Sequence, residues 1–148
     1  MSDPKPSHGP SLPYTRRAVL LSAGERRFFH EGLKPAVANT YLVSFKVRLA
    51  DVITVKDWQS AHGRRIAQKH LDFVLVTPKS TRIMAAIELN DSSHDSNDRR
   101  HRAEFVVSAL SSAHVPFVTF PIYQRYDPTK IRRKVFAAIA QHRTVRDR

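Results

Sequence analysis

The 148-residue sequence contains no cysteine at all. Disulfides, and zinc or iron–sulfur sites held by thiolates, are therefore excluded, and the lack of thiols fits a reducing cytoplasm, where we expect the protein. No apolar run is long enough to cross a bilayer, which argues against a membrane span. An apolar signal region is also missing near the N-terminus, because this stretch is interrupted by Pro4, Pro6, Pro10 and Pro13.

Acidic residues are scarce: 13 Asp and Glu stand against 25 Lys and Arg, a formal net charge of +12. A field of that sign favours polyanionic partners, although a basic surface that serves only solubility is the alternative. Neither a basic amphipathic helix nor a lipidation motif is evident, so we expect DNA rather than a membrane as the partner. Zinc-finger, helix-turn-helix and RNA-recognition signatures are absent, and a protein partner or a homodimer is not indicated.

The length corresponds to one domain. We predict a flexible arm rich in Pro, Ser and charge over residues 1–20, a folded domain over 21–141, and a basic tail over 142–148.

Within the domain, the hydrophobic pattern predicts helices and strands in alternation. A capping box of Ser22 and Glu25 opens a helix that Pro35 and Asn39 should end. A strand over 41–47 follows, with Tyr41, Val43, Phe45 and Val47 facing one way, and then a long excursion over 48–69. The remaining expected elements are apolar strands at 71–76 and 82–89, a helix from residue 98, a strand at 117–120 and a helix opened by residues 127–128. This order predicts an α/β fold with a central mixed sheet flanked by helices.

Two acids interrupt the apolar strands: Asp72 lies between Leu71 and Phe73, and Glu88 between Ile87 and Leu89. A carboxylate in such surroundings is costly unless it is paired, protonated or bound to a metal. Each acid could pair separately with a Lys or Arg. Taken together, two acids on consecutive strands favour a shared divalent cation, and we predict that Asp72 and Glu88 bind Mg²⁺, with Mn²⁺ as an alternative.

Polar and basic residues surround this pair in the sequence. Asn90 should share the face of Glu88, where it could orient water or offer a carbonyl to a metal. His94 could be a general base, a metal ligand, a phosphate clamp or an ordinary surface histidine. Phosphates could be held by Arg64, Arg65, Arg99, Arg100 and Arg102, for which a solvated helical face is the alternative.

Asp72 followed by Glu88-Leu89-Asn90 resembles the Asp…(Glu/Asp)-x-Lys pattern of the PD-(D/E)XK, or restriction-endonuclease-like, nuclease superfamily. Residues 23–29, 46–52, 69–75 and 87–94 are similar to a bacterial domain family of unknown function in that superfamily, and the likeness extends over residues 20–139. A more distant likeness is to the very-short-patch repair endonucleases, which also place a histidine after the second acid.

The resemblance implies a restriction-endonuclease-like core with αβββαβ order and a Mg²⁺-dependent DNA endonuclease that hydrolyses phosphodiester bonds. Asp72 and Glu88 match the metal-binding acids, and His94 matches a general base or phosphate-contacting histidine. Glu25 matches a helix-borne catalytic glutamate, although the capping box explains it equally well. Asn90 departs from the pattern because the superfamily has Lys there, so Lys69 or Lys46 would have to replace that charge. Otherwise the chain is a weakened or inactive nuclease fold that acts as a nucleic-acid-binding module.

Overall fold

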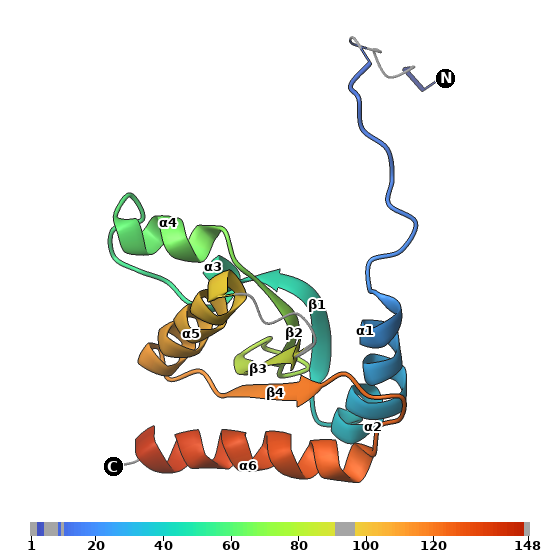
Figure 1. The fold of residues 1–148 in the computed structure, drawn as a ribbon, viewed down its shortest axis with the longest axis vertical. Coiled ribbons are helices and arrows are strands. Elements are labelled where there is room, and N and C mark those ends of the chain that lie inside the picture. The colour runs from blue at the N-terminus through green and yellow to red at the C-terminus, as the bar shows by residue number, and fades with distance from the viewer. Residues whose placement is uncertain (1–2, 5–8, 10, 91–96, 147–148) are drawn as a thin grey trace.

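The structure is a computed structural model that describes residues 3–4, 9, 11–90 and 97–146, with the side chains of 97–99 and 143–146 left aside. Its helical elements are α1 (Ala23–Arg27), the π-helix η1 (Phe28–Leu33), α2 (Lys34–Val37), α3 (Leu49–Val52), α4 (Ala61–Ala67), α5 (Asn97–Ser112) and α6 (Pro128–Arg146). The strands are β1 (Leu42–Arg48), β2 (His70–Val76), β3 (Ile83–Asn90) and β4 (Phe117–Pro121). Figure 1 shows their arrangement.

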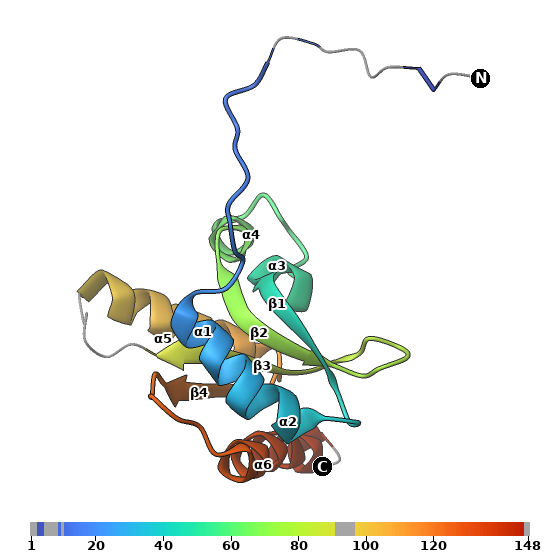
Figure 2. The same cartoon turned by 90° about the vertical axis from the view of Figure 1, so that its right-hand side faces the viewer.

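The four strands form one sheet in the order β1-β2-β3-β4. Strand β2 runs antiparallel to both of its neighbours, β1 and β3, and β4 runs parallel to β3 after the crossover through α5. The π-helix η1 and helices α2 and α6 pack on one face and α5 on the other (Figures 1 and 2). The predicted α/β fold with a mixed sheet flanked by helices is therefore confirmed, and the 48–69 excursion contains the two short helices α3 and α4.

The helical segment that opens the domain starts as predicted and ends just before Asn39, one of the two residues expected to end it. Ser22 Oγ accepts a hydrogen bond from the Glu25 amide, and Glu25 Oε1 accepts one from the Ser22 amide, so the capping box is formed. Pro35, however, does not end the helix, which runs on to Val37. The π-turn before it, closed by the Lys34 amide, alters the hydrogen-bond pattern where proline has no N–H to donate.

The two hydrophobic clusters of the core lie on opposite faces of the sheet, and β1 changes faces along its length. Val43 and Phe45 pack in the cluster under η1, α2 and α6, whereas Val47 packs in the cluster under α5, so the prediction that all of them face one way is wrong. The change occurs at Lys46, which has φ = 51°, a left-handed conformation that is rare inside a strand. Phe73 and Leu71 on β2 show the same switch across Asp72.

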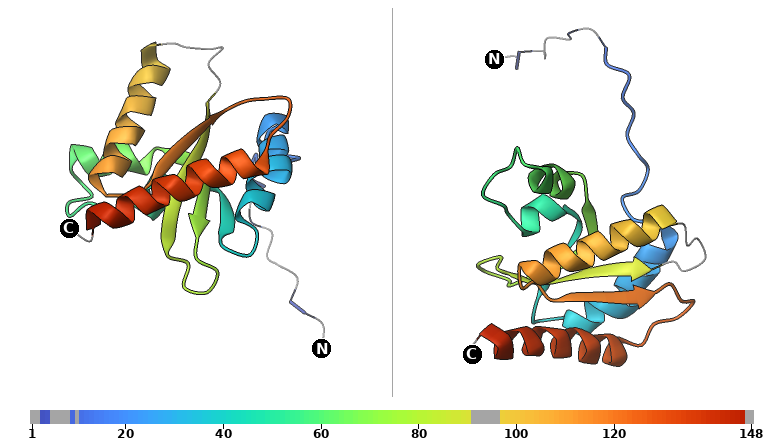
Figure 3. Two further views of the ribbon diagram at one scale, coloured as in Figure 1. Left: turned by 90° about the horizontal axis from the view of Figure 1, so that it is seen from below. Right: turned by 60° about the vertical axis from the view of Figure 1, so that its left-hand side comes forward.

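The described chain is exposed at its N-terminal end and helical at its C-terminal end. Residues 11–20 are exposed and run away from the sheet without regular structure (Figure 1). Helix α6 lies across the α1–α2 face of the sheet (Figure 3). None of the helices described is long and apolar enough to cross a membrane.

Candidate active site

Four polar residues lie in one row across the sheet, one from each strand. The β1–β2 pairs on either side of Lys46 place it opposite Asp72. The β2–β3 register, continued by one residue, places Asp72 opposite Glu88, which itself pairs with Thr119 on β4. Directly opposed residues on neighbouring strands have Cβ atoms about 5 Å apart. The two acids predicted as a pair are therefore neighbours.

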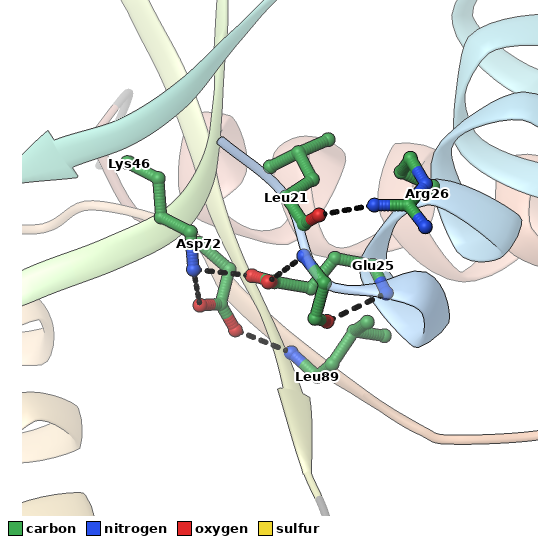
Figure 4. A network of polar contacts seen from close by, with 7 residues as sticks. Leu21, Glu25, Arg26, Lys46, Asp72 and Leu89 are labelled. Carbon is green, nitrogen blue, oxygen red and sulfur yellow. Dashed lines mark hydrogen bonds and ion pairs between the residues drawn. The ribbon is translucent and has the colours of Figure 1, made fainter. Parts of the chain in front are cut away.

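Helix α1 adds a third carboxylate to this row (Figure 4). Lys46 Nζ lies 2.5 Å from Glu25 Oε2 and 3.8 Å from Asp72 Oδ1. Asp72 Oδ2 accepts a hydrogen bond of 3.0 Å from the Leu89 amide on β3. One lysine thus joins two carboxylates that come from different elements, and a backbone amide fixes the second of them. We name Glu25, Lys46, Asp72 and Glu88 the acid–lysine cluster.

Glu25 closes the capping box and also contacts Lys46, while its catalytic role stays a prediction. Its Oε1 closes the capping box with Ser22, while its Oε2 accepts from Lys46. Partial burial raises the pKa of Glu25, but the hydrogen bonds from Lys46 and Ser22 outweigh that effect and the net pKa is lowered. Glu25 is therefore ionised at neutral pH and holds the Lys46 ammonium in place.

The other two acids of the cluster are less well compensated. Burial raises the pKa of Asp72, against the lowering effect of the Leu89 amide, and the nearby Glu25 charge raises it further. Burial also raises the pKa of Glu88, to about 7, and the charge of Asp72 adds to this. Lys46 lowers the pKa of both, but not enough to cancel the rise. One cation shared by three carboxylates leaves excess negative charge in a partly buried place, which suits a further hard cation.

Glu88 also borders an open groove of about 580 Å³ between the end of β3 and the start of α5. Lys69 precedes β2 on one side of this groove, and Arg102 projects from α5 on the other. Asn90 lines it too, as its spacing from Glu88 predicted. The structure thus brings together Glu88, Asn90, Lys69 and Arg102, with two positive charges placed to receive a phosphate near the acids.

The remaining predicted phosphate-binding residues lie elsewhere. Arg65 on α4 stacks on Phe105 of α5, with 4.0 Å from its Cζ to the ring centroid, so its guanidinium has a packing role. Arg64 is exposed on α4 and does not line the groove. Arg100 is exposed in the first turns of α5. His94 and the side chain of Arg99 lie outside the described residues.

A metal site is not evident from side-chain geometry alone. In the described part of the chain, no three His, Asp or Glu residues are grouped so that they could hold a metal ion. Asp72 and Glu88 offer the hard oxygen atoms that Mg²⁺ prefers, whereas Glu25 is engaged by Lys46. The two predicted ligands fit such a cation by chemistry, and the binding itself stays a prediction.

Lys46 is the residue whose importance the sequence understated. It was expected only as an alternative to Lys69, yet its ammonium is the group that contacts the acids. Its left-handed backbone is an uncommon state that costs on the order of 1 kcal/mol or more and is characteristic of functional sites. No feature of the local sequence indicates such a conformation at a lysine.

Comparisons with known proteins give one result for this chain. A family model described as "Protein of unknown function (DUF2726)" matches residues 17–139. Neither a curated protein nor a solved structure matches. The match spans all four strands and all four members of the acid–lysine cluster.

Proposed function

The chain belongs to the DUF2726 family, and we propose that it is a metal-dependent DNA endonuclease built on a restriction-endonuclease-like core. One observation carries the proposal: Glu25, Lys46, Asp72 and Glu88 converge from a helix and three successive strands. The PD-(D/E)XK pattern has two strand-borne acids and a lysine, and a helix-borne glutamate completes many such sites. The element order and the basic groove beside Glu88 support the same conclusion.

Asp72 and Glu88 would hold the cation, Mg²⁺ or Mn²⁺. When bound, it would polarise the phosphate and lower the pKa of a water molecule. The Leu89 amide keeps Asp72 oriented by occupying Oδ2. Repulsion between the two acids, which raises the pKa of Glu88, is the energetic reason for them to bind a cation.

Lys46 would supply the charge that the superfamily places at the position of Asn90. It reaches the acids from β1 instead of β3, and Glu25 anchors its ammonium. A fixed positive charge next to the acids stabilises the negative charge that develops on phosphate as water adds to phosphorus and one P–O ester bond breaks. Lys69 and Arg102 would hold the phosphate backbone in the groove.

The test is incubation of the purified chain with supercoiled plasmid, linear duplex and single-stranded DNA in Mg²⁺ or Mn²⁺. We expect cleavage that EDTA abolishes and that Asp72→Ala reduces at least 100-fold, on the order of the loss of a group that stabilises the transition state. Asp51→Ala is the matched control, because Asp51 is exposed and pairs with Arg48 away from the cluster. Undiminished cleavage by Asp72→Ala would refute the proposal.

A non-catalytic nucleic-acid-binding module is the second candidate. The observation that favours it is Lys46, which already bridges Glu25 and Asp72, while Asn90 stands where the superfamily has Lys. This candidate predicts DNA retention that falls steeply with salt and no product in either metal. Any product that disappears in Asp72→Ala excludes it.

A further inference from the structure

The chain turns from the end of β4 into α6 (Figures 1 and 3). A second pocket lies at this turn. Its volume is about 330 Å³. Three aromatic rings and three cationic side chains dominate its lining: Phe120, Tyr123, Tyr126, Arg125, Lys130 and Lys134. The acid among its lining residues, Asp127, has Oδ1 bonded to the Thr129 amide at the start of α6. The pocket is therefore lined by aromatic rings and carries a net positive charge.

The inner wall of this pocket is fixed by packing. The Tyr126 ring meets buried Phe28 edge-on, with centroids 5.1 Å apart. Its hydroxyl donates to the Pro121 carbonyl and accepts from the Tyr123 amide, which closes the loop on itself. Tyr123, by contrast, is 57% exposed, and its ring centroid lies 6.0 Å from that of Tyr126. A rigid loop thus presents one open aromatic ring to the solvent.

The pocket adjoins the row of polar residues across the sheet. Lys134 Nζ donates to the carbonyl of Thr119, the residue paired with Glu88, and lies over the Phe120 ring. Tyr123 follows four residues after Thr119, so their Cα atoms are at most about 14 Å apart. The pocket lies on the α6 face of the sheet and the groove beside Glu88 on the α5 face, with the edge strand β4 between them. A single strand of several nucleotides would therefore reach from Glu88 to Tyr123 around the β4 edge.

An open aromatic ring among cations is the combination that binds single-stranded nucleic acid, in which bases stack on the ring and phosphates contact the cations. Bases inside a duplex are stacked on one another and cannot offer a face to Tyr123. We infer that the pocket binds an unpaired nucleotide of DNA, next to the strand held at the acid–lysine cluster. The inference rests on the proposed function for DNA as the ligand, and it names the substrate class: single-stranded, frayed or branched DNA.

Binding in EDTA tests this without cleavage. The probes are a fluorescently labelled single-stranded oligonucleotide and a blunt duplex of the same length, measured by anisotropy. We expect the wild-type chain to bind the single strand more tightly, and Tyr123→Ala to weaken that binding about 10-fold while duplex affinity changes less than about twofold. Tyr123→Phe, which keeps the ring, should restore the affinity. Tyr14→Ala is the matched control, because Tyr14 is also exposed but lies in the N-terminal segment.

The outcomes separate this inference from the proposed nuclease activity. Loss of single-strand affinity in Tyr123→Ala supports the pocket even if no metal produces cleavage. Unchanged single-strand affinity in Tyr123→Ala, or an equal loss on duplex and single strand, overturns it even if the chain proves to be a nuclease. A wild-type preference for the blunt duplex also overturns it.

Discussion

Replacement of Glu88 by glutamine should stabilise the metal-free protein while it removes a proposed metal ligand. The pKa of Glu88 is raised from 4.5 to about 7, first by burial and then by the charge of Asp72. A shift of that size corresponds to on the order of 3 kcal/mol of destabilisation when the carboxylate is ionised, at about 1.4 kcal/mol per pKa unit. This is an upper bound, because Glu88 is only partly buried and borders an open groove.

The sign follows from proton linkage. The folded state retains a proton on Glu88 at pH values where the unfolded chain has lost it, so the stability of the wild-type protein falls as pH rises from about 4.5 to about 7. The pKa of Asp72 is also raised and adds to the same trend. Glu88→Gln removes the contribution of Glu88, and the curve should become flatter. The variant should match the wild type near pH 4.5 and exceed it by about 1 to 3 kcal/mol above pH 7.

The measurement is the free energy of unfolding from denaturant titrations in EDTA, at about pH 4.5 and about pH 8.5. Glu31→Gln is the matched control, since Glu31 is exposed on η1 outside the cluster, and it should change stability at neither pH. With Mg²⁺ present, the wild type should gain stability and Glu88→Gln should gain little. If Glu88→Gln is less stable than the wild type at the higher pH in EDTA, the excess negative charge inferred for the cluster does not exist.

Two further predictions concern the cluster lysine and the backbone that supports the site. Lys46→Met removes the cation that lowers the pKa values of Asp72 and Glu88. We expect DNA cleavage to be lost while Mg²⁺ binds about tenfold more tightly, as measured by the dependence of Tm on Mg²⁺ concentration. Weaker Mg²⁺ binding would contradict the inference that Lys46 competes with a metal cation for the same carboxylates. Gly63→Ala would bring a methyl group against the backbone of Trp58, so it should lower the free energy of unfolding by about 2 kcal/mol or more. In Gly24→Ala the added methyl group meets only the Ile122 side chain, at 3.5 Å, and the change should be neutral or stabilising. Thermal unfolding of the two variants would show this contrast.

The features that could be predicted from the sequence are those written in short-range patterns. The apolar runs on both sides of Asp72 and Glu88 predict central strands. A carboxylate inside such a run is costly to bury in any fold, so its position predicts a site that must compensate its charge. The capping box depends on a spacing of three residues and formed as expected. Even so, spacing could not show that Glu25 also contacts Lys46, because a carboxylate has two oxygen atoms and the capping box uses only one of them.

The contacts of the individual basic residues could not be predicted, because net charge says that cations are abundant and not what each one touches. Arg65 was expected at a phosphate, but its guanidinium lies on the Phe105 ring. Arg102 and Lys69, which are 33 positions apart in the sequence numbering, meet at the same groove because α5 packs against the sheet beside the start of β2. Only the tertiary fold distinguishes a basic side chain that stacks on an aromatic ring from one that lines the groove.

Lys46 shows most clearly why part of the site is invisible in the sequence. Strict alternation along β1 leads to the expectation that Val47 shares a face with Phe45, and this fails because Lys46 is left-handed. Asp72 lies directly across from it, at the point where β2 switches faces as well. Lys46 is therefore both the residue at which the side chains of β1 change faces and the cation that contacts the acids. A left-handed residue persists inside a strand only when its surroundings stabilise it, and here those surroundings include the contacts of the Lys46 ammonium with Glu25 and Asp72.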